Sequence, residues 1–322
     1  MTLSSLWTQR HRQDQMGPVS VFGFGVLIGL VGLRIAAMFV DSSPRLGLQD
    51  EQLLPAMAGP SWDHLLGTDQ LGRDLLLRMV DAVEAFFLPG LFACLVAALI
   101  AVPTGAIAGY WEGSKGAAVL RGLLTMISAW PRLVLVVVVV AIFTGSVRDP
   151  AAWAEVRLYL LGGLVGLSYI PQLGGAVSER VQHFRREQFV EAARAHGLSD
   201  RRILLWHILW ANCRHLVLRH TCTLFGAFIL VETSLSYLGD YGVPPPRPSW
   251  GNILAGVRHS VVHSRSLMAS SDSWSPAGLW GGVEQAIQHG GLLGVLAPTI
   301  AIAVSIAGVL ALAEHYARRD RP

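Results

Sequence analysis

Apolar residues along the chain cluster in blocks of about 20, which is longer than the core of a soluble domain needs. A helix that crosses the ~30 Å hydrocarbon core of a bilayer requires about 20 residues. Six segments meet this requirement, at residues 18–40, 86–110, 120–145, 157–178, 214–238 and 290–313. The pattern therefore predicts an all-α, polytopic membrane protein with six transmembrane helices.

The composition agrees with a membrane protein and excludes a disordered one. Of the 322 residues, 52% are hydrophobic and 15% are charged, against about 25% charged in ordinary soluble domains. The formal net charge is +3, and we attribute the basic excess to membrane topology rather than to nucleic-acid binding. The three cysteines, Cys94, Cys213 and Cys222, lie in or near predicted spans and are too few for a disulfide framework.

The distribution of lysine and arginine predicts the orientation. If the N-terminus is cytoplasmic, the inner segments carry most of the basic residues, as the positive-inside rule requires. The chain then divides into a cytoplasmic N-tail (1–17), a first span (18–40), an external segment (41–85), a core domain (86–313) and a cytoplasmic C-tail (314–322). Within the core domain, residues 179–213 form a cytoplasmic loop and residues 239–289 an external one.

The cytoplasmic loop has the pattern of a helix, a turn and a second helix. Residues 187–196 favour a helix, Gly197 suits a left-handed C-terminal position, and Ser199 suits an N-cap. The second helix is expected over residues 200–210 and would place four side chains along one side: Ile203, Leu204, His207 and Ile208. Such a hairpin cannot bury its apolar face alone, so docking to a protein partner and docking to the membrane both remain open.

Patterns for catalysis are absent from the sequence. There is no Walker A motif, no H-E-x-x-H and no G-x-S-x-G, so a phosphate cradle, a zinc protease site and a nucleophile elbow are not expected. Glu232 is the one acid well inside a predicted span, where it is either functional or a buried structural hydrogen-bond partner. His259 and His263 share a helical spacing but lack a third ligand, so no metal site is predicted.

Three stretches resemble one family. Residues 67–74 read G-T-D-Q-L-G-R-D, the cytoplasmic loop holds Glu191-Ala192-Ala193 followed by Gly197, and residues 232–252 contain E-x-x-L-S-Y-L-G and P-S-W-G-N. These resemble motifs of the permease subunits of ABC importers in the dipeptide/oligopeptide/nickel group, specifically the second, C-type permease. One departure is Trp210, which stands where the family usually has proline; another is Thr125, where an acid is usual.

The resemblance implies a type I ABC-importer permease fold and a bacterial inner-membrane location. It implies a non-catalytic subunit that binds no cofactor, with ATP and Mg on two partner ATPase subunits, a second permease as a heterodimer partner, and an external solute-binding protein. The residues carried over fall into three groups. They are an ATPase-coupling loop (Glu191, Ala192, Ala193, Gly197, Asp200, His207, Ile208), a translocation path or external gate (Glu232, Ser249, Trp250) and a structural motif (Gly67, Thr68, Asp69, Gly72, Arg73, Asp74).

Peptide is the expected cargo, with nickel or a metal chelate as the alternative. A transporter driven by an ion gradient is a more remote reading, because such proteins often carry internal repeats and several ionisable residues at mid-membrane. An intramembrane enzyme lacks any catalytic pattern here.

Overall fold

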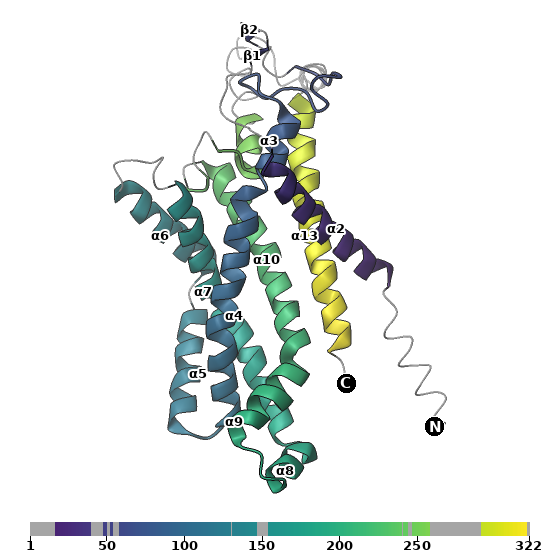
Figure 1. The fold of residues 1–322 in the computed structure, drawn as a ribbon. Helices are drawn as coiled ribbons and strands as arrows, with labels where there is room; N and C mark the ends of the chain where they lie inside the picture. The colour runs from purple at the N-terminus through teal and green to yellow at the C-terminus, as the bar shows by residue number, and fades with distance from the viewer. Residues whose placement is uncertain are drawn as a thin grey trace, which may run out of the picture.

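A computed structural model describes residues 17–39, 48–49, 52–53, 58–129, 131–146, 154–239, 241–243, 247–257 and 291–320. Its long elements are helices that run side by side in a bundle (Figure 1). In chain order the long and short helices of the bundle are α2 (Pro18–Ala37), α3 (Leu75–Asp81), α4 (Glu84–Tyr110), α5 (Lys115–Ser128), α6 (Arg132–Ser146), α7 (Ala154–Arg185), α8 (Gln188–Ala195), α9 (Asp200–Arg202), the π-helix η1 (Ile203–Cys213), α10 (Arg214–Leu238) and α13 (Gly291–Arg319).

Two smaller elements lie at the α3 end of the bundle. Strands β1 (Leu48–Gln49) and β2 (Gln52–Leu53) pair antiparallel, with Leu48 opposite Leu53. Residues 250–257 form a further short helix. The two strands are the only ones in the described ranges, so the all-α prediction is confirmed for every element that could cross a membrane.

Five helical segments in the described residues are long and apolar enough to cross a membrane, rather than the six expected. They run over Pro18–Ala37, Leu75–Tyr110, Val156–Arg185, Asp200–Leu238 and Leu292–Arg319. The expected span at 120–145 is divided into α5 and α6, which have 14 and 15 residues. Pro131 explains the division, because proline lacks an N–H and disfavours the helical conformation of the residue before it.

The centre of the bundle is a close contact between α4 and α7, which run in the same direction. Ala93, Ala97 and Ala101 of α4 are fully buried. A Cβ added to Gly166 of α7 would lie 2.6 Å from the carbonyl oxygen of Ala93. Small side chains thus bring the two backbones into contact, which stabilises helix pairs in membranes through van der Waals packing.

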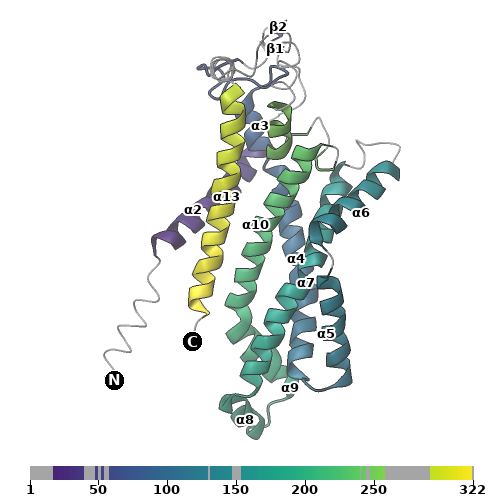
Figure 2. The same cartoon turned by 180° about the vertical axis from the view of Figure 1, so that it is seen from behind.

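Helix α10 packs beside both α7 and α13, and α2 crosses the outer side of α13 (Figure 2). Near one end of α2 the Ser20 hydroxyl lies 2.7 Å from Nδ1 of His315 on α13. Near the other end Arg34 forms an ion pair with Glu84 of α4 at 3.5 Å. Polar contacts therefore fix both ends of a helix whose side chains otherwise mostly face outward.

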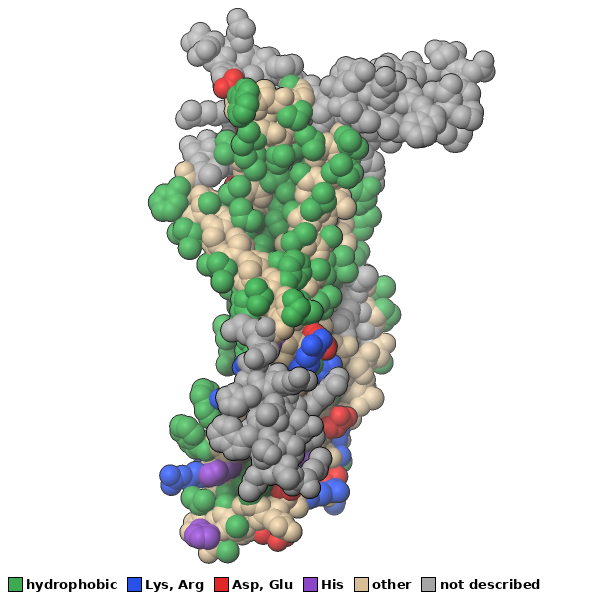
Figure 3. All heavy atoms as spheres, turned by 90° about the vertical axis from the view of Figure 1, so that its right-hand side faces the viewer, with side chains coloured by type: hydrophobic (Ala, Val, Ile, Leu, Met, Phe, Trp, Pro, Cys, Tyr) green, Lys and Arg blue, Asp and Glu red, His purple; other side chains and the backbone are tan. Residues whose placement is uncertain are grey.

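The side chains on the surface change from hydrophobic to charged along the length of the bundle. Figure 3 shows hydrophobic side chains covering the middle of one face, and arginine, acidic and histidine side chains gathered toward the α8 end. This distribution is typical of a protein whose middle lies in hydrocarbon and whose ends lie at the two membrane surfaces.

Candidate functional site

The segment between α7 and α10 forms a hairpin at one end of the bundle (Figure 1). Helix α8 is its first arm, and α9 with η1 is its second. Gly197 makes the turn at a φ of +78°, where a residue with a Cβ is strained. The Gly197 N–H donates to the carbonyl of Arg194 (2.9 Å) and the Leu198 N–H to the carbonyl of Ala193 (3.1 Å). These two bonds form a Schellman motif, so the predicted left-handed turn is confirmed.

The second arm differs from the expected α-helix. Only three residues are α-helical before the 11-residue π-helix begins. Because π-helical hydrogen bonds join residues five apart, Ile203 and Ile208 share the buried side, whereas His207 is exposed. The expectation that His207 lies on the same side as these isoleucines is therefore wrong. The Ser199 side chain makes no capping hydrogen bond, and only its backbone carbonyl accepts one, from Ile203 (3.0 Å).

A polar junction joins both arms of the hairpin to the end of α4. The Tyr110 hydroxyl donates to Oδ1 of Asp200 (2.5 Å) and accepts from Nη2 of Arg194 (3.0 Å). Nε of Arg194 also lies 3.2 Å from Oδ1 of Asp200. Beside this junction Arg186 forms an ion pair with Glu112 (2.9 Å). In the sequence, Tyr110 lies 84 residues from Arg194 and 90 residues from Asp200. No local sequence pattern therefore predicts that Tyr110 contacts the hairpin.

The hairpin presents one side outward. On α8, Val190 is fully buried, whereas Glu191 and Ala192 are exposed. Gly197 is also exposed, and a Cβ there would meet nothing within 4 Å. The first arm is thus held to the bundle by Val190 and by the half-buried Ala193, and it leaves Glu191 and Ala192 open to a partner.

The G-T-D-x-L-G-R-D stretch folds as a compact loop at the opposite end of the bundle. Gly67 and Gly72 have φ values of +77° and +71°, which explains the glycines of the motif. Thr68 Oγ1 accepts from the N–H of Ala58 (2.8 Å). Asp74 caps α3 by accepting from the N–H of Leu77 (3.0 Å), as expected for an aspartate at this position.

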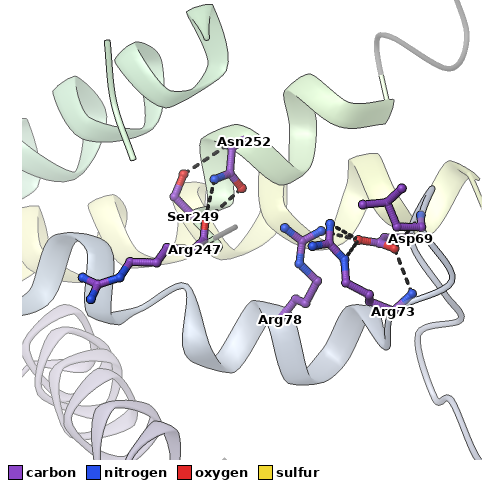
Figure 4. Close-up of polar contacts among 7 residues, drawn as sticks. Asp69, Arg73, Arg78, Arg247, Ser249 and Asn252 are labelled. Atoms are coloured by element: carbon purple, nitrogen blue, oxygen red, sulfur yellow. Dashed lines mark hydrogen bonds and ion pairs between the residues drawn. The ribbon is translucent and has the colours of Figure 1, made fainter. Parts of the chain in front are cut away.

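Asp69 is the centre of this loop (Figure 4). Its carboxylate accepts from the N–H groups of Leu71 (2.8 Å) and Arg73 (2.9 Å), and both the Arg73 and Arg78 guanidinium groups bind it. Burial by itself would raise the pKa of Asp69. The backbone hydrogen bond from Arg73 and the charge of Arg78 outweigh burial, so the pKa lies below its ordinary value of 3.8.

We expect Asp69→Asn to destabilise the fold by roughly 3 kcal/mol at pH 7, since it leaves two partly buried arginines without their anion. A lowered pKa stabilises the folded chain above pH 3.8, and this contribution is lost as pH falls through the folded value. The stability gap between wild type and Asp69→Asn should therefore be constant near neutral pH and shrink below about pH 3.8. Thermal unfolding in detergent across this range measures the gap. Asp63→Asn, at an exposed position in the same segment, is the control; an equal loss in it would contradict the assignment.

The E-x-x-L-S and P-S-W-G-N stretches meet beside α3. Glu232 is fully buried, and its Oε1 accepts from the Ser236 hydroxyl (2.7 Å). The Ser249 hydroxyl interacts with the same carboxyl group, although Oε2 has no partner at hydrogen-bonding distance among the described residues. Trp250 is also buried, and its Nε1 donates to the carbonyl of Met79 (3.0 Å). Glu232, Ser249 and Trp250 are therefore buried close together. This packing favours the interpretation of Glu232 as a buried structural hydrogen-bond partner.

The residues singled out from the sequence therefore lie in two places. The hairpin residues lie at the α8 end of the bundle, and the other two groups lie around α3 at the opposite end (Figure 1). No group of three or more metal-ligating side chains occurs within the described ranges. His259 and His263 lie outside those ranges.

Comparison with known proteins places the chain beside transport proteins. Residues 101–321 match the model of the family described as binding-protein-dependent transport system inner membrane component. The dipeptide transport system permease protein DppC of Alkalihalophilus pseudofirmus is 27% identical over 260 residues, which are 81% of this chain and 80% of the relative. The glutathione transport system permease protein GsiD of Pectobacterium atrosepticum is 30% identical over 204 residues, or 63% of each chain.

Proposed function

This chain belongs to the family of binding-protein-dependent transport system inner membrane components, and we propose that it is the C-type permease subunit of an ATP-driven importer of peptides. It is a multi-pass inner membrane protein. In the proposal it forms half of the translocation pathway beside a second permease. Two separate ATPase subunits hydrolyse ATP, and an external binding protein delivers the cargo.

The observation that carries this proposal is the way in which the hairpin is attached to the bundle. Helix α8 follows α7, η1 runs directly into α10, and Tyr110 connects Asp200 and Arg194 to α4. A force applied to the exposed side of α8 would therefore reach three long helices. Glu191 and Gly197 are the residues that we propose to meet the ATPase.

Such an attachment suits a two-state mechanism. The ATPase would bind the hairpin more tightly in one conformation of the permease than in the other. ATP would change which of the two conformations is favoured. A partner shifts an equilibrium only by the difference in its affinity for the two states. The chain then needs no catalytic group of its own.

Peptide is the proposed cargo because the relatives are described as dipeptide and glutathione permeases, and glutathione is itself a tripeptide. Nickel or a metal chelate remains the alternative within the same architecture. The described residues contain no cluster that would hold a metal, which gives the alternative no support from this chain.

The energy source tests the proposal. We expect peptide uptake by cells that carry the importer to stop when the ATPase subunits are deleted. Uptake should continue after an uncoupler collapses the proton gradient, as long as ATP is maintained. Radiolabelled dipeptide uptake measures both, with a proton-coupled transporter in the same cells as the control. Uptake that needs the gradient and ignores ATPase loss would refute the proposal.

A further inference from the structure

The second arm of the hairpin carries an exposed stripe that the proposed ATPase contact does not use. Arg202, Trp206, Trp210 and Arg214 follow one another at intervals of four residues, and all four are exposed. Trp206 and Trp210 are 63% and 66% exposed. Their ring centroids lie 6.5 Å apart. We call these four residues the Arg–Trp stripe.

The stripe is held outward by the opposite side of the same helix. Ile203 and Ile208 are fully buried and Leu204 nearly so, within the main hydrophobic core. Rotating η1 to bury the two tryptophans would expose these three side chains to water. The outward orientation of the stripe is therefore a consequence of the fold, and its apolar rings need another surface to cover them.

The depth of η1 identifies that surface as the edge of the bilayer. Helix α10 has 25 residues, or about 37 Å at 1.5 Å per residue, which already exceeds a hydrocarbon core of about 30 Å. The continuous segment Asp200–Leu238 is 39 residues long, so its η1 part must lie at or beyond the headgroups on the α8 side. Tryptophan is enriched at this depth, where its ring is half apolar and half polar.

The positive charge around the stripe favours an anionic headgroup. The sequence has no acidic residue from Arg201 to Val231. Asp200, the nearest acid in the sequence, is already bound to Tyr110 and Arg194, and Asp320, whose charge acts on His215, is paired with Arg180. The two arginines at the ends of the stripe present planar donor groups whose geometry matches a phosphate, and they are more weakly hydrated than lysine.

We propose that the Arg–Trp stripe binds anionic phospholipid headgroups in the leaflet on the α8 side and thereby anchors the second arm of the hairpin to the membrane surface. The tryptophan rings pack between the headgroups, and Arg202 and Arg214, at the two ends of the stripe, bind the phosphates of different lipids. The ATPase surface that we assign lies on the other arm, at Glu191 and at the Gly197 turn.

Photo-crosslinking in the native membrane tests this proposal on the intact complex. The crosslinker p-benzoylphenylalanine replaces Trp206 or Trp210, and irradiated complexes are analysed by gel and mass spectrometry. We expect adducts of phospholipid mass, enriched in phosphatidylglycerol or cardiolipin over phosphatidylethanolamine relative to the bulk membrane. Ile28→p-benzoylphenylalanine, at a 70% exposed position on α2, reports the lipid that contacts an ordinary apolar surface.

Charge removal then tests the anionic preference. Arg202→Gln/Arg214→Gln should lower the ratio of anionic to zwitterionic adduct by about fivefold if one of the two arginines binds lipid and by about thirtyfold if both do, since each basic residue at a membrane surface contributes about 1 kcal/mol. Arg318→Gln/Arg319→Gln removes the same charge from two exposed positions at the same end of the bundle and should leave the ratio unchanged.

Three outcomes would overturn the proposal. Adducts of Trp206 and Trp210 variants with the sister permease or an ATPase would show that a protein covers the stripe. Lipid adducts with the headgroup composition seen at Ile28 would show a contact without anionic preference. No adduct, while the Ile28 variant gives lipid adducts, would show that the stripe lies in water.

Discussion

Replacing Gly197 by arginine should reduce peptide uptake to background while the chain still inserts and folds. Gly197 sits at a φ of +78°, so any side chain there adds about 1–2 kcal/mol of strain to an exposed turn. That cost is local. The larger effect arises because nothing lies within 4 Å of the added Cβ, so the arginine projects from the surface that we assign to the ATPase. Uptake of labelled dipeptide and co-purification of the ATPase subunits should fall together.

Gly113→Arg is the matched control for this experiment. Gly113 lies in the turn between α4 and α5 at a φ of +89°, again with nothing within 4 Å of a Cβ. It therefore reproduces the backbone strain, the open surroundings and the added charge outside the hairpin. We expect near-normal uptake in this variant. Equal loss in both variants, or normal uptake with Gly197→Arg, would remove the case for docking at this turn.

Replacing Gly166 by leucine should strongly destabilise the bundle. Even a Cβ at this position would lie 2.6 Å from the carbonyl oxygen of Ala93 and 3.2 Å from its Cα. Both neighbours are backbone or backbone-bound atoms that no rotamer change can move, so α4 and α7 must separate. We expect a loss of about 3 kcal/mol or more, as in severe overpacking of a core. Thermal unfolding of the purified chain in detergent measures it.

Gly175→Leu provides the comparison on the same helix. Gly175 also lies in α7, but a Cβ there meets nothing within 4 Å. Leucine should be neutral there, or stabilise by up to about 1 kcal/mol, since glycine is the poorer helix former. A similar loss of stability in the two variants would mean that helix propensity or lipid contact, rather than the α4–α7 contact, controls this helix.

Local patterns were sufficient for the elements whose cause is local. Five of the six predicted spans correspond to long apolar helices, because crossing hydrocarbon imposes a length and a composition that the sequence records directly. The left-handed turn at Gly197 follows from the rarity of positive φ in other residues. The resemblance to importer permeases, built on three short motifs, agrees with the family match over residues 101–321.

Other features were not predicted correctly or completely from local patterns. Asp200 is the first residue of α9, and only the structure shows that its carboxylate binds Tyr110 and Arg194. Residues 200–210 were expected to form an α-helix, and a π-helix turned His207 outward. Pro131 explains why the predicted span at 120–145 is divided into α5 and α6. The apolar residues on both sides of Pro131 led to the prediction of one continuous helix.

The sequence by itself determined that this protein lies in a membrane, where five of its long helices begin to within a few residues, and which family it resembles. These properties depend on composition, on local conformational preference and on short motifs. Only the tertiary structure decided that Tyr110 ties the hairpin to α4, that Asp69 gathers two arginines, and that Trp206 and Trp210 face outward. Each of these depends on which surfaces the bundle buries, and burial is set by packing among helices far apart in the chain.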